Sequence, residues 1–330
     1  MRRIFYGGNK RNNSTCSVSD AFVRGKIMSE TSVKTPASSG LSELHVRPIA
    51  GALGAEISGI RLSGALDPQI FAELKALLHK HKVIFIRGQV HLSDQEQEAF
   101  ASLFGNPVPH PTVPSADGTS AILSIDSKRG NRADSWHSDV TFVPNYPKVT
   151  VLRGVVVPPV GGDTVWANTT LAYDTLPAPL KILADNLHAI HTNTYDYAAS
   201  HRVTSSPESL EYRRIFTATQ FETEHPVVRI HPVTGERTLL LGHFVKKFVG
   251  LSQRDSRRIL EFFQDHITGV DNTVRWQWKV GDVAIWDNQA TQHRAVNDFG
   301  DEPRLLRRST IEGEIPVGVD GFVSTVVSAE

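Results

Sequence analysis

Apolar residues recur at helical spacing in three stretches of the chain, and each stretch begins at a residue typical of helix starts. Asp67 is followed by a proline, which is favoured at the first helical position. Ser93 and Glu96 have the spacing of a capping box. The three predicted helices start at Asp67, run from Ser93 to Phe104, and run from Ser252 to about Ile267.

Short runs of β-branched and aromatic residues dominate the rest of the chain, which predicts mostly strands. Residues 44–62 alternate short apolar stretches with glycines, as in short strands joined by turns. Further strands are predicted at Val83–Ile86, Val149–Val157, Thr164–Trp166, Val227–Ile230, Thr238–Leu241, Val274–Trp278, Val283–Trp286 and Leu305–Ile311. Many short strands with a few helices predict a mainly β fold, a sandwich or barrel with flanking helices.

Two polar segments interrupt this pattern. Residues 29–42 are rich in Ser, Thr, Pro and Gly, so we predict a disordered tail over 1–43 and one domain over 44–330. Before Met28, six basic residues accompany a single acid, which is typical of a transit peptide. Because no amphipathic period is present, we favour a disordered tail or a start codon mis-called upstream of Met28. The second segment, Asp196–Glu222, is a candidate mobile lid or crossover.

Composition narrows the class of protein. The 330 residues include 35 basic and 35 acidic side chains, so bulk charge favours neither a nucleic-acid nor a membrane partner. No apolar run approaches the roughly 20 residues of a membrane span. The single cysteine, Cys16, excludes an intrachain disulfide and a cysteine-based metal site. We expect a cytoplasmic homo-oligomer that acts on a small molecule.

The candidate chemistry begins with an H-x-D pattern. His137 and Asp139 are two positions apart, and on a strand such side chains share a face and can reach one metal ion. His293, near the end of the segment that starts at Trp286, is a candidate third ligand. Two histidines and a carboxylate are the ligands of non-haem Fe(II) oxygenases. In isolation, however, each of these residues is more often structural.

The arginines that follow His293 strengthen this interpretation. If the segment from Arg304 to Arg308 is a strand, these two side chains share one face and Arg307 points to the other. Guanidinium groups inside a barrel are costly without anionic partners, and arginine can hold a carboxylate or sulfo group bidentately. We therefore predict that Arg304 and Arg308 bind anions inside the fold and that Arg307 pairs with surface acids.

Several segments together resemble the taurine dioxygenase superfamily, and most closely its sulfate ester dioxygenase (alkylsulfatase) branch. The resemblance covers about 44–321, nearly all of the predicted domain. It rests on Trp136–Phe142 (WHSDVTF), Gly161–Trp166 (GGDTVW), the run from Trp286 through His293 to Arg308, His110–Pro114 (HPTVP), Tyr195–Tyr197 (YDY), Thr223–Arg229 (TEHPVVR) and Gly242–Lys246 (GHFVK).

This resemblance implies a double-stranded β-helix, or jelly roll, that encloses an Fe(II) ion. It places His137, Asp139 and His293 on the metal ligands. It assigns Arg304 and Thr164 to 2-oxoglutarate, Arg308 to the cosubstrate or the sulfo group of the substrate, and His110 and Val140 to substrate contacts. Gln289 departs from the pattern, since relatives usually carry arginine there; this leaves the chemistry in place but bears on loop packing and substrate range.

The implied reaction consumes 2-oxoglutarate and O₂ and hydroxylates the carbon that bears the sulfate oxygen, so that the product collapses to an aldehyde and sulfate. One alternative is a taurine or alkylsulfonate dioxygenase that releases sulfite. Another is a non-catalytic jelly-roll protein that holds a metal ion. Intact ligands together with an intact Arg304 argue against the non-catalytic alternative.

Overall fold

The fold is taken from a computed structural model that describes residues 44–129, 133–194 and 207–327. These residues belong to one compact unit. The tail predicted over 1–43 lies outside the described residues, as does most of the first half of the predicted lid.

The larger sheet is built around two central strands, β6 and β14, that pair along most of their length. Its order is β1-β2-β3-β14-β6-β16-β4, with β5 also pairing with β16. All of its pairs are antiparallel except β2 with β3. The strands are β1 (His45–Pro48), β2 (Ala55–Ser58), β3 (Val83–Ile86), β4 (Pro107–Val108), β5 (Ile122–Asp126), β6 (Val149–Val156), β14 (Val283–Asp287) and β16 (Leu305–Ile311).

Three smaller antiparallel sheets accompany the large one among the described residues. One has the order β13-β7-β15, another β12-β8-β9-β17, and β10 pairs with β11. Their strands are β7 (Thr164–Asn168), β8 (His188–Thr192), β9 (Glu222–Pro226), β10 (Val228–Ile230), β11 (Arg237–Leu239), β12 (Val245–Phe248), β13 (Thr273–Trp276), β15 (Thr291–Ala295) and β17 (Thr325–Val326).

An apolar core fills the space between β3, β14, β6 and β16 on one side and β7 and β13 on the other. Its largest members are aromatic. Trp166 from β7 and Trp286 from β14 are fully buried, with ring centroids 5.6 Å apart. Phe85 from β3 stacks on Trp276 from β13 at 4.2 Å. These contacts join the two sheets into the predicted jelly roll.

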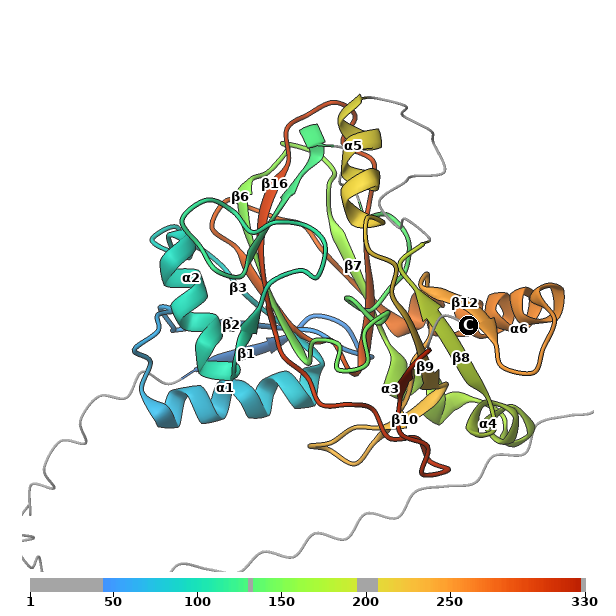
Figure 1. The fold of residues 1–330 in the computed structure, drawn as a ribbon. Coiled ribbons are helices and arrows are strands. Elements are labelled where there is room, and N and C mark those ends of the chain that lie inside the picture. The colour runs from blue at the N-terminus through green and yellow to red at the C-terminus, as the bar shows by residue number, and fades with distance from the viewer. Residues whose placement is uncertain (1–43, 130–132, 195–206, 328–330) are drawn as a thin grey trace, which may run out of the picture. The chain divides into compact units, whose positions relative to one another are not determined.

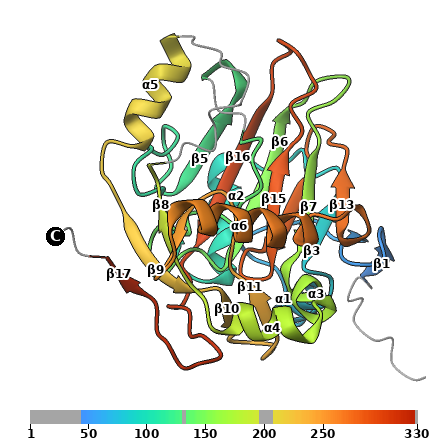
Figure 2. The ribbon, with the colours of Figure 1, turned by 90° about the vertical axis from the view of Figure 1, so that its right-hand side faces the viewer.

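Helices cover the outer faces of this sandwich. Leu74 and Leu78 of α1 (Pro68–His81) and Phe100 of α2 (Asp94–Ala101) pack on the large sheet. On the other side, α6 (Gln253–Ile267) crosses the β13-β7-β15 sheet (Figure 2), near α3 (Thr169–Thr175) and α4 (Ala178–Asp185). The helix α5 (Pro207–Phe216) stands above β5 and β8 (Figures 1 and 2).

The three predicted helices are present, with the expected caps. Asp67 Oδ1 accepts a hydrogen bond from Gln69 N at 2.8 Å, and Ser93 and Glu96 form both bonds of the capping box. The second helix is shorter than predicted, because α2 ends at Ala101 and a 3₁₀ turn follows. The predicted strands are present, with ends that differ by at most two residues. The helices α3, α4 and α5 and the strands β4, β5, β8, β9, β12, β15 and β17 were not predicted.

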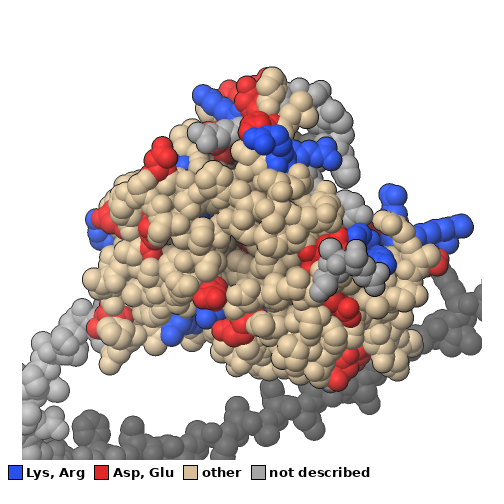
Figure 3. Space-filling model, viewed as in Figure 1, with Lys and Arg blue, Asp and Glu red and all other residues tan. Residues whose placement is uncertain are grey.

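The described surface carries charges of both signs. In the view of Figure 3, basic side chains gather over α5 and α6, and acidic side chains lie beside them. No described helix combines the length and apolar character needed to cross a membrane.

Candidate active site

His137 and His293 face each other across two antiparallel segments. His137 N donates to His293 O at 3.1 Å, and His293 N donates to His137 O at 2.8 Å. Such a reciprocal pair holds two residues directly opposite each other. The two rings consequently lie side by side, with centroids 4.3 Å apart. His137 Nδ1 lies 2.8 Å from Ser135 O and so carries the ring hydrogen, which leaves the lone pair on Nε2.

Asp139 lies in a turn and joins the two histidines as the third candidate metal ligand. The strand on which His137 and Asp139 were expected is not formed, because only His137 makes a ladder bridge and Val140 has φ 59°, which cannot continue a strand. The side chains still converge. Asp139 Oδ1 lies 3.7 Å from His137 Nε2 and 3.9 Å from His293 Nε2. Thr150 Oγ1 donates to Asp139 Oδ2 at 3.0 Å.

These three side chains fit a divalent metal ion. One ligand atom from each lies within 4.8 Å of the others, and all three residues are buried. Two imidazoles and one carboxylate, grouped on one side, match the donor set that leaves coordination positions open for other ligands.

The charge state of the group also suits a metal. Burial alone would raise the pKa of Asp139, but Arg308 and His293 outweigh it and hold this pKa well below its ordinary value. Burial, followed by the charge of His137, lowers the pKa of His293 well below its ordinary value. A carboxylate at Asp139 and a neutral imidazole at His293 are the protonation states in which these two residue types bind metals.

Arg304 and Thr164 lie together in the cavity that His137 and His293 also line. Arg304 Nε donates to Gly162 O at 2.8 Å, and its Nη2 donates to Thr164 Oγ1 at 3.3 Å. Trp278 Nε1 donates to the same hydroxyl at 3.0 Å. Burial lowers the pKa of Arg304 to about 10, so the guanidinium remains charged at neutral pH.

The three neighbouring arginines divide between two faces, as predicted. Arg308 is buried and Nη1 donates to Asp139 Oδ1, so it points into the site. Arg307 points to the other face, where its Nε donates to Asp94 Oδ2 at 2.9 Å. Arg304 shares the inner face with Arg308, as the two-residue period of a strand requires.

His110 and Val140 lie close to the site, since the charges of Arg308 and Asp139 act on His110 and Val140 directly follows Asp139 in the chain. His110 Nδ1 accepts from Val113 N at 3.1 Å, so the hydrogen is on Nε2, which is buried and has no partner among the described residues. Burial, followed by the charge of Arg308, lowers the pKa of His110 to about 3, so the ring is neutral. Val140 is buried in an aromatic cluster formed with Phe142, Tyr212, Phe216 and Phe244.

Comparison with known proteins gives the family. The model described as "Taurine catabolism dioxygenase TauD, TfdA family" matches residues 45–310, most of the chain. The chain belongs to this family. The dioxygenase class and the jelly-roll fold predicted from the sequence are therefore confirmed.

Similar proteins include members of the sulfate ester branch. The chain is 58% identical over 283 residues to an α-ketoglutarate-dependent sulfate ester dioxygenase of Pseudomonas putida, covering 86% of this chain and 94% of that protein. It is 54% identical over 281 residues to an alkylsulfatase of Acinetobacter baylyi, covering 85% and 88%. The crystal structure of a taurine dioxygenase from Burkholderia xenovorans matches with a TM-score of 0.73 and 38% identity, covering 87% and 95%. The predicted resemblance to this branch is confirmed.

Sequence reasoning missed the residues that support the predicted ones. Thr150 and Asn288 both bond to Asp139, and neither was singled out, because their contacts join positions far apart in the chain. Phe216 was missed together with α5, whose polar sequence has no sustained apolar period. No local signal identifies such contacts.

Proposed function

We propose that the protein is an Fe(II)- and 2-oxoglutarate-dependent dioxygenase that cleaves alkyl sulfate esters to an aldehyde and sulfate. The observation that carries this proposal is the location of His137, Asp139 and His293 in one buried group beside the charged Arg304. Relatives at 58% and 54% identity that are named for sulfate esters support the substrate class.

In this proposal His137, Asp139 and His293 hold Fe(II). When bound, the iron supplies the coupling of O₂ reduction to 2-oxoglutarate decarboxylation, which yields succinate, CO₂ and the oxidising power for a C–H bond. The protein supplies placement and charge.

Arg304 and Thr164 bind the distal carboxylate of 2-oxoglutarate. The Arg304 guanidinium is buried and charged, which strengthens its attraction to a carboxylate in a low dielectric. The Thr164 hydroxyl already accepts two hydrogen bonds within the protein, so its hydrogen is available to the ligand. Together they provide a charged donor and a neutral donor for one carboxylate.

His110 and Arg308 bind the sulfate group of the substrate. His110 presents an Nε2–H without a partner, and a neutral donor of this kind can bond a sulfate oxygen without the cost of burying a second charge. Arg308 supplies the positive charge next to the metal ligand Asp139. The aromatic cluster around Val140 forms an apolar wall next to His110, since the rings of His110 and Phe216 are 5.5 Å apart. We assign the alkyl chain to this wall.

The reaction follows from this placement. Hydroxylation inserts one oxygen atom of O₂ into the C–H bond next to the ester oxygen, and the other oxygen atom enters succinate. The hydroxyl then loses its proton, a C=O bond forms, and the C–O bond to sulfate breaks with its electron pair leaving on sulfate. No general base of the protein is needed, because sulfate is a weakly basic leaving group.

The products test the proposal. Protein supplied with Fe(II), 2-oxoglutarate, O₂ and a medium-chain alkyl sulfate should release sulfate, aldehyde and succinate in equal amounts. His137→Ala and Asp139→Ala should abolish succinate formation. A sulfonate dioxygenase, the alternative suggested by the taurine dioxygenase structure, would instead break a C–S bond and release sulfite from taurine. A higher kcat/KM for sulfite from taurine than for sulfate from any alkyl sulfate would overturn the substrate assignment.

A further inference from the structure

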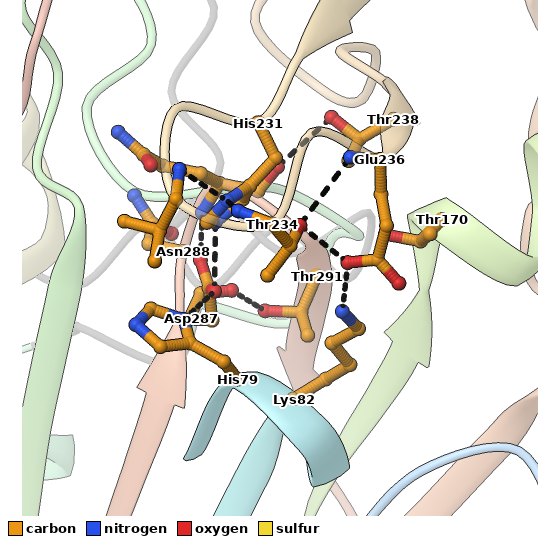
Figure 4. Close-up of polar contacts among 12 residues, drawn as sticks. His79, Lys82, Thr170, His231, Thr234, Glu236, Thr238, Asp287, Asn288 and Thr291 are labelled. Carbon is orange, nitrogen blue, oxygen red and sulfur yellow. Dashed lines mark hydrogen bonds and ion pairs between the residues drawn. The ribbon is translucent and has the colours of Figure 1, made fainter. Parts of the chain in front are cut away.

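The Asn288 side chain holds the main chain of Asp139 on both sides. Asn288 Oδ1 accepts from Asp139 N at 2.8 Å, and Nδ2 donates to Asp139 O at 3.1 Å and to Pro147 O at 2.8 Å. Asn288 is fully buried and lies in the turn between β14 and β15 (Figure 4). A carboxamide presents a donor and an acceptor side by side, so it can pair with one residue's main chain as a neighbouring strand would.

Asp139 needs such a partner because no strand provides one. It lies in a turn, so its buried N–H and C=O have no sheet ladder. The next residue, Val140, has a positive φ, which is a strained conformation for a β-branched side chain and persists only where its surroundings enforce it. The two bonds from Asn288 fix the main chain directly before this strained residue.

The turn that carries Asn288 is itself anchored through Asp287. Asp287 Oδ2 accepts from His231 Nε2 at 2.9 Å and from His79 Nδ1 at 3.2 Å, as Figure 4 shows. Its Oδ1 accepts from Gln289 N at 3.1 Å within the turn. Burial alone would raise the pKa of Asp287, but the bonds from His231 and His79 outweigh it and hold this pKa well below its ordinary value. Asp287 is therefore an ionised acceptor between α1 and the β10–β11 hairpin.

The same three residues have the composition of a metal site, but the hydrogen bonds of His231 argue against that use. His231 Nδ1 accepts from Val233 N at 3.2 Å and from Thr234 N at 3.1 Å, so the ring hydrogen is on Nε2. That hydrogen points at Asp287, and a metal ion would require the lone pair of the same nitrogen. The cluster is thus a hydrogen-bonded network.

We propose that Asn288 is a positioning residue for the metal ligand Asp139, and that Asp287, held by His79 and His231, fixes the turn from which Asn288 acts. The same turn leads directly into β15, which carries His293. One anchored turn therefore sets the position of ligands from two distant parts of the chain. This inference rests on the proposed function, in which Asp139 and His293 bind iron.

The test compares two buried asparagines with matched hydrogen bonds. Asn193 Nδ2 donates to Phe216 O at 3.0 Å and to Thr219 O at 2.7 Å, and its Oδ1 accepts from Phe221 N at 2.8 Å. Asn193→Ala thus removes the same number of side-chain hydrogen bonds as Asn288→Ala, but none to a metal ligand.

Metal affinity is measured anaerobically with Fe(II), and with Co(II) as a spectroscopic probe of the ligand set. We expect Asn288→Ala to lower the affinity for both ions at least about tenfold and to change the visible Co(II) spectrum, because support of a first ligand typically contributes that much. Asn193→Ala should lose similar thermal stability and keep wild-type affinity and spectrum. Should Asn288→Ala not fold, Asn288→Asp keeps the shape and the acceptor while removing the donor to Asp139 O, and the same loss of affinity is expected.

The inference would be overturned if an Asn288 variant lost as much stability as Asn193→Ala but bound both ions with wild-type affinity and spectrum. Asn288 would then have a purely structural role. Failure of the proposed function would look different. In that case the wild-type protein itself would develop no visible absorption when Fe(II) and 2-oxoglutarate are added without O₂.

Discussion

At the scale of single residues, the hydroxyl of Thr164 has only its hydrogen left to offer a ligand, because Trp278 and Arg304 use its acceptor positions. Thr164→Val keeps the shape of the side chain and removes this donor, together with the acceptor for Trp278 and Arg304. We expect the KM for 2-oxoglutarate to rise about tenfold, as for the loss of one hydrogen bond of about 1.4 kcal/mol to a charged group, with little change in the KM for the alkyl sulfate. Initial rates of succinate formation at varied 2-oxoglutarate measure both; equal rises in the two KM values would contradict the assignment.

Residue type and spacing indicated which side chains meet at the site, and the family resemblance was needed to assign them together. His137, Asp139, His293, Arg304 and Arg308 all line or adjoin one buried space, as expected. The supporting residues could not be predicted in this way. Asn288 acts through contacts to a residue 149 positions away, and an asparagine in a turn has many ordinary reasons to be there.

At the scale of elements, the turn before β7 determines how closely Arg304 can approach Thr164. Gly162 has φ +70°, and a Cβ there would lie 3.1 Å from Arg304 Cδ and 2.9 Å from Pro158 Cγ. Gly162→Ala should therefore displace the guanidinium and weaken 2-oxoglutarate binding at least about tenfold, the effect of roughly 1.4 kcal/mol. Gly235→Ala is the matched control, since Gly235 has φ +71° and open space around it. Titration with 2-oxoglutarate should separate the two variants, and equal affinity in both would show that only backbone strain matters.

Elements were predictable where the local sequence alone determines them. The capping box at Ser93 and the β-branched run of β6 give the observed helix start and strand with little error. In contrast, α3 has only 7 residues. Its N-cap is Asn168, whose side chain accepts from Thr170 N and Leu171 N, and a helix this short depends on such a cap and on tertiary packing. The segment from His137 to Asp139 was expected to be a strand but ends in a turn, because the positive φ of Val140 is imposed by its surroundings and cannot continue a strand.

Local sequence also gave little information on the segment predicted as a lid or crossover, Asp196–Glu222, of which 196–206 lies outside the described residues. Its second part forms α5, and Tyr212 and Phe216 pack in the aromatic cluster next to His110. Whether this segment closes over substrate stays a prediction. The packing of α5 was not visible in the sequence because only one face of a short polar helix is buried.

At the scale of the whole molecule, the jelly roll was predictable as a class from many short strands with outer helices, whereas its strand order was not. β3 pairs with β14 across about 200 positions, and such pairing depends on which faces pack together in the core.

One consequence of this packing is that several histidines are enclosed in the interior. His225 is fully buried between Thr141 O and Ser324 Oγ, at 2.8 and 2.7 Å.

The buried histidines should make the folded state sensitive to acid. Burial lowers the pKa of His225 from 6.5 to about 3, despite the opposing bond to Thr141 O. Between these values the unfolded chain binds a proton that the folded protein does not, so the stability present above pH 6.5 is lost as the pH falls toward 3. Each such group contributes a slope of about 1.4 kcal/mol per pH unit. His225→Gln keeps a donor for Thr141 O and cannot titrate. The free energy of unfolding of the metal-free protein is measured in urea between pH 6 and 4. Its slope against pH should be smaller in this variant than in the wild type, by the equivalent of about one proton. An unchanged slope would mean that His225 is charged in the folded state or that the interior opens before His225 titrates.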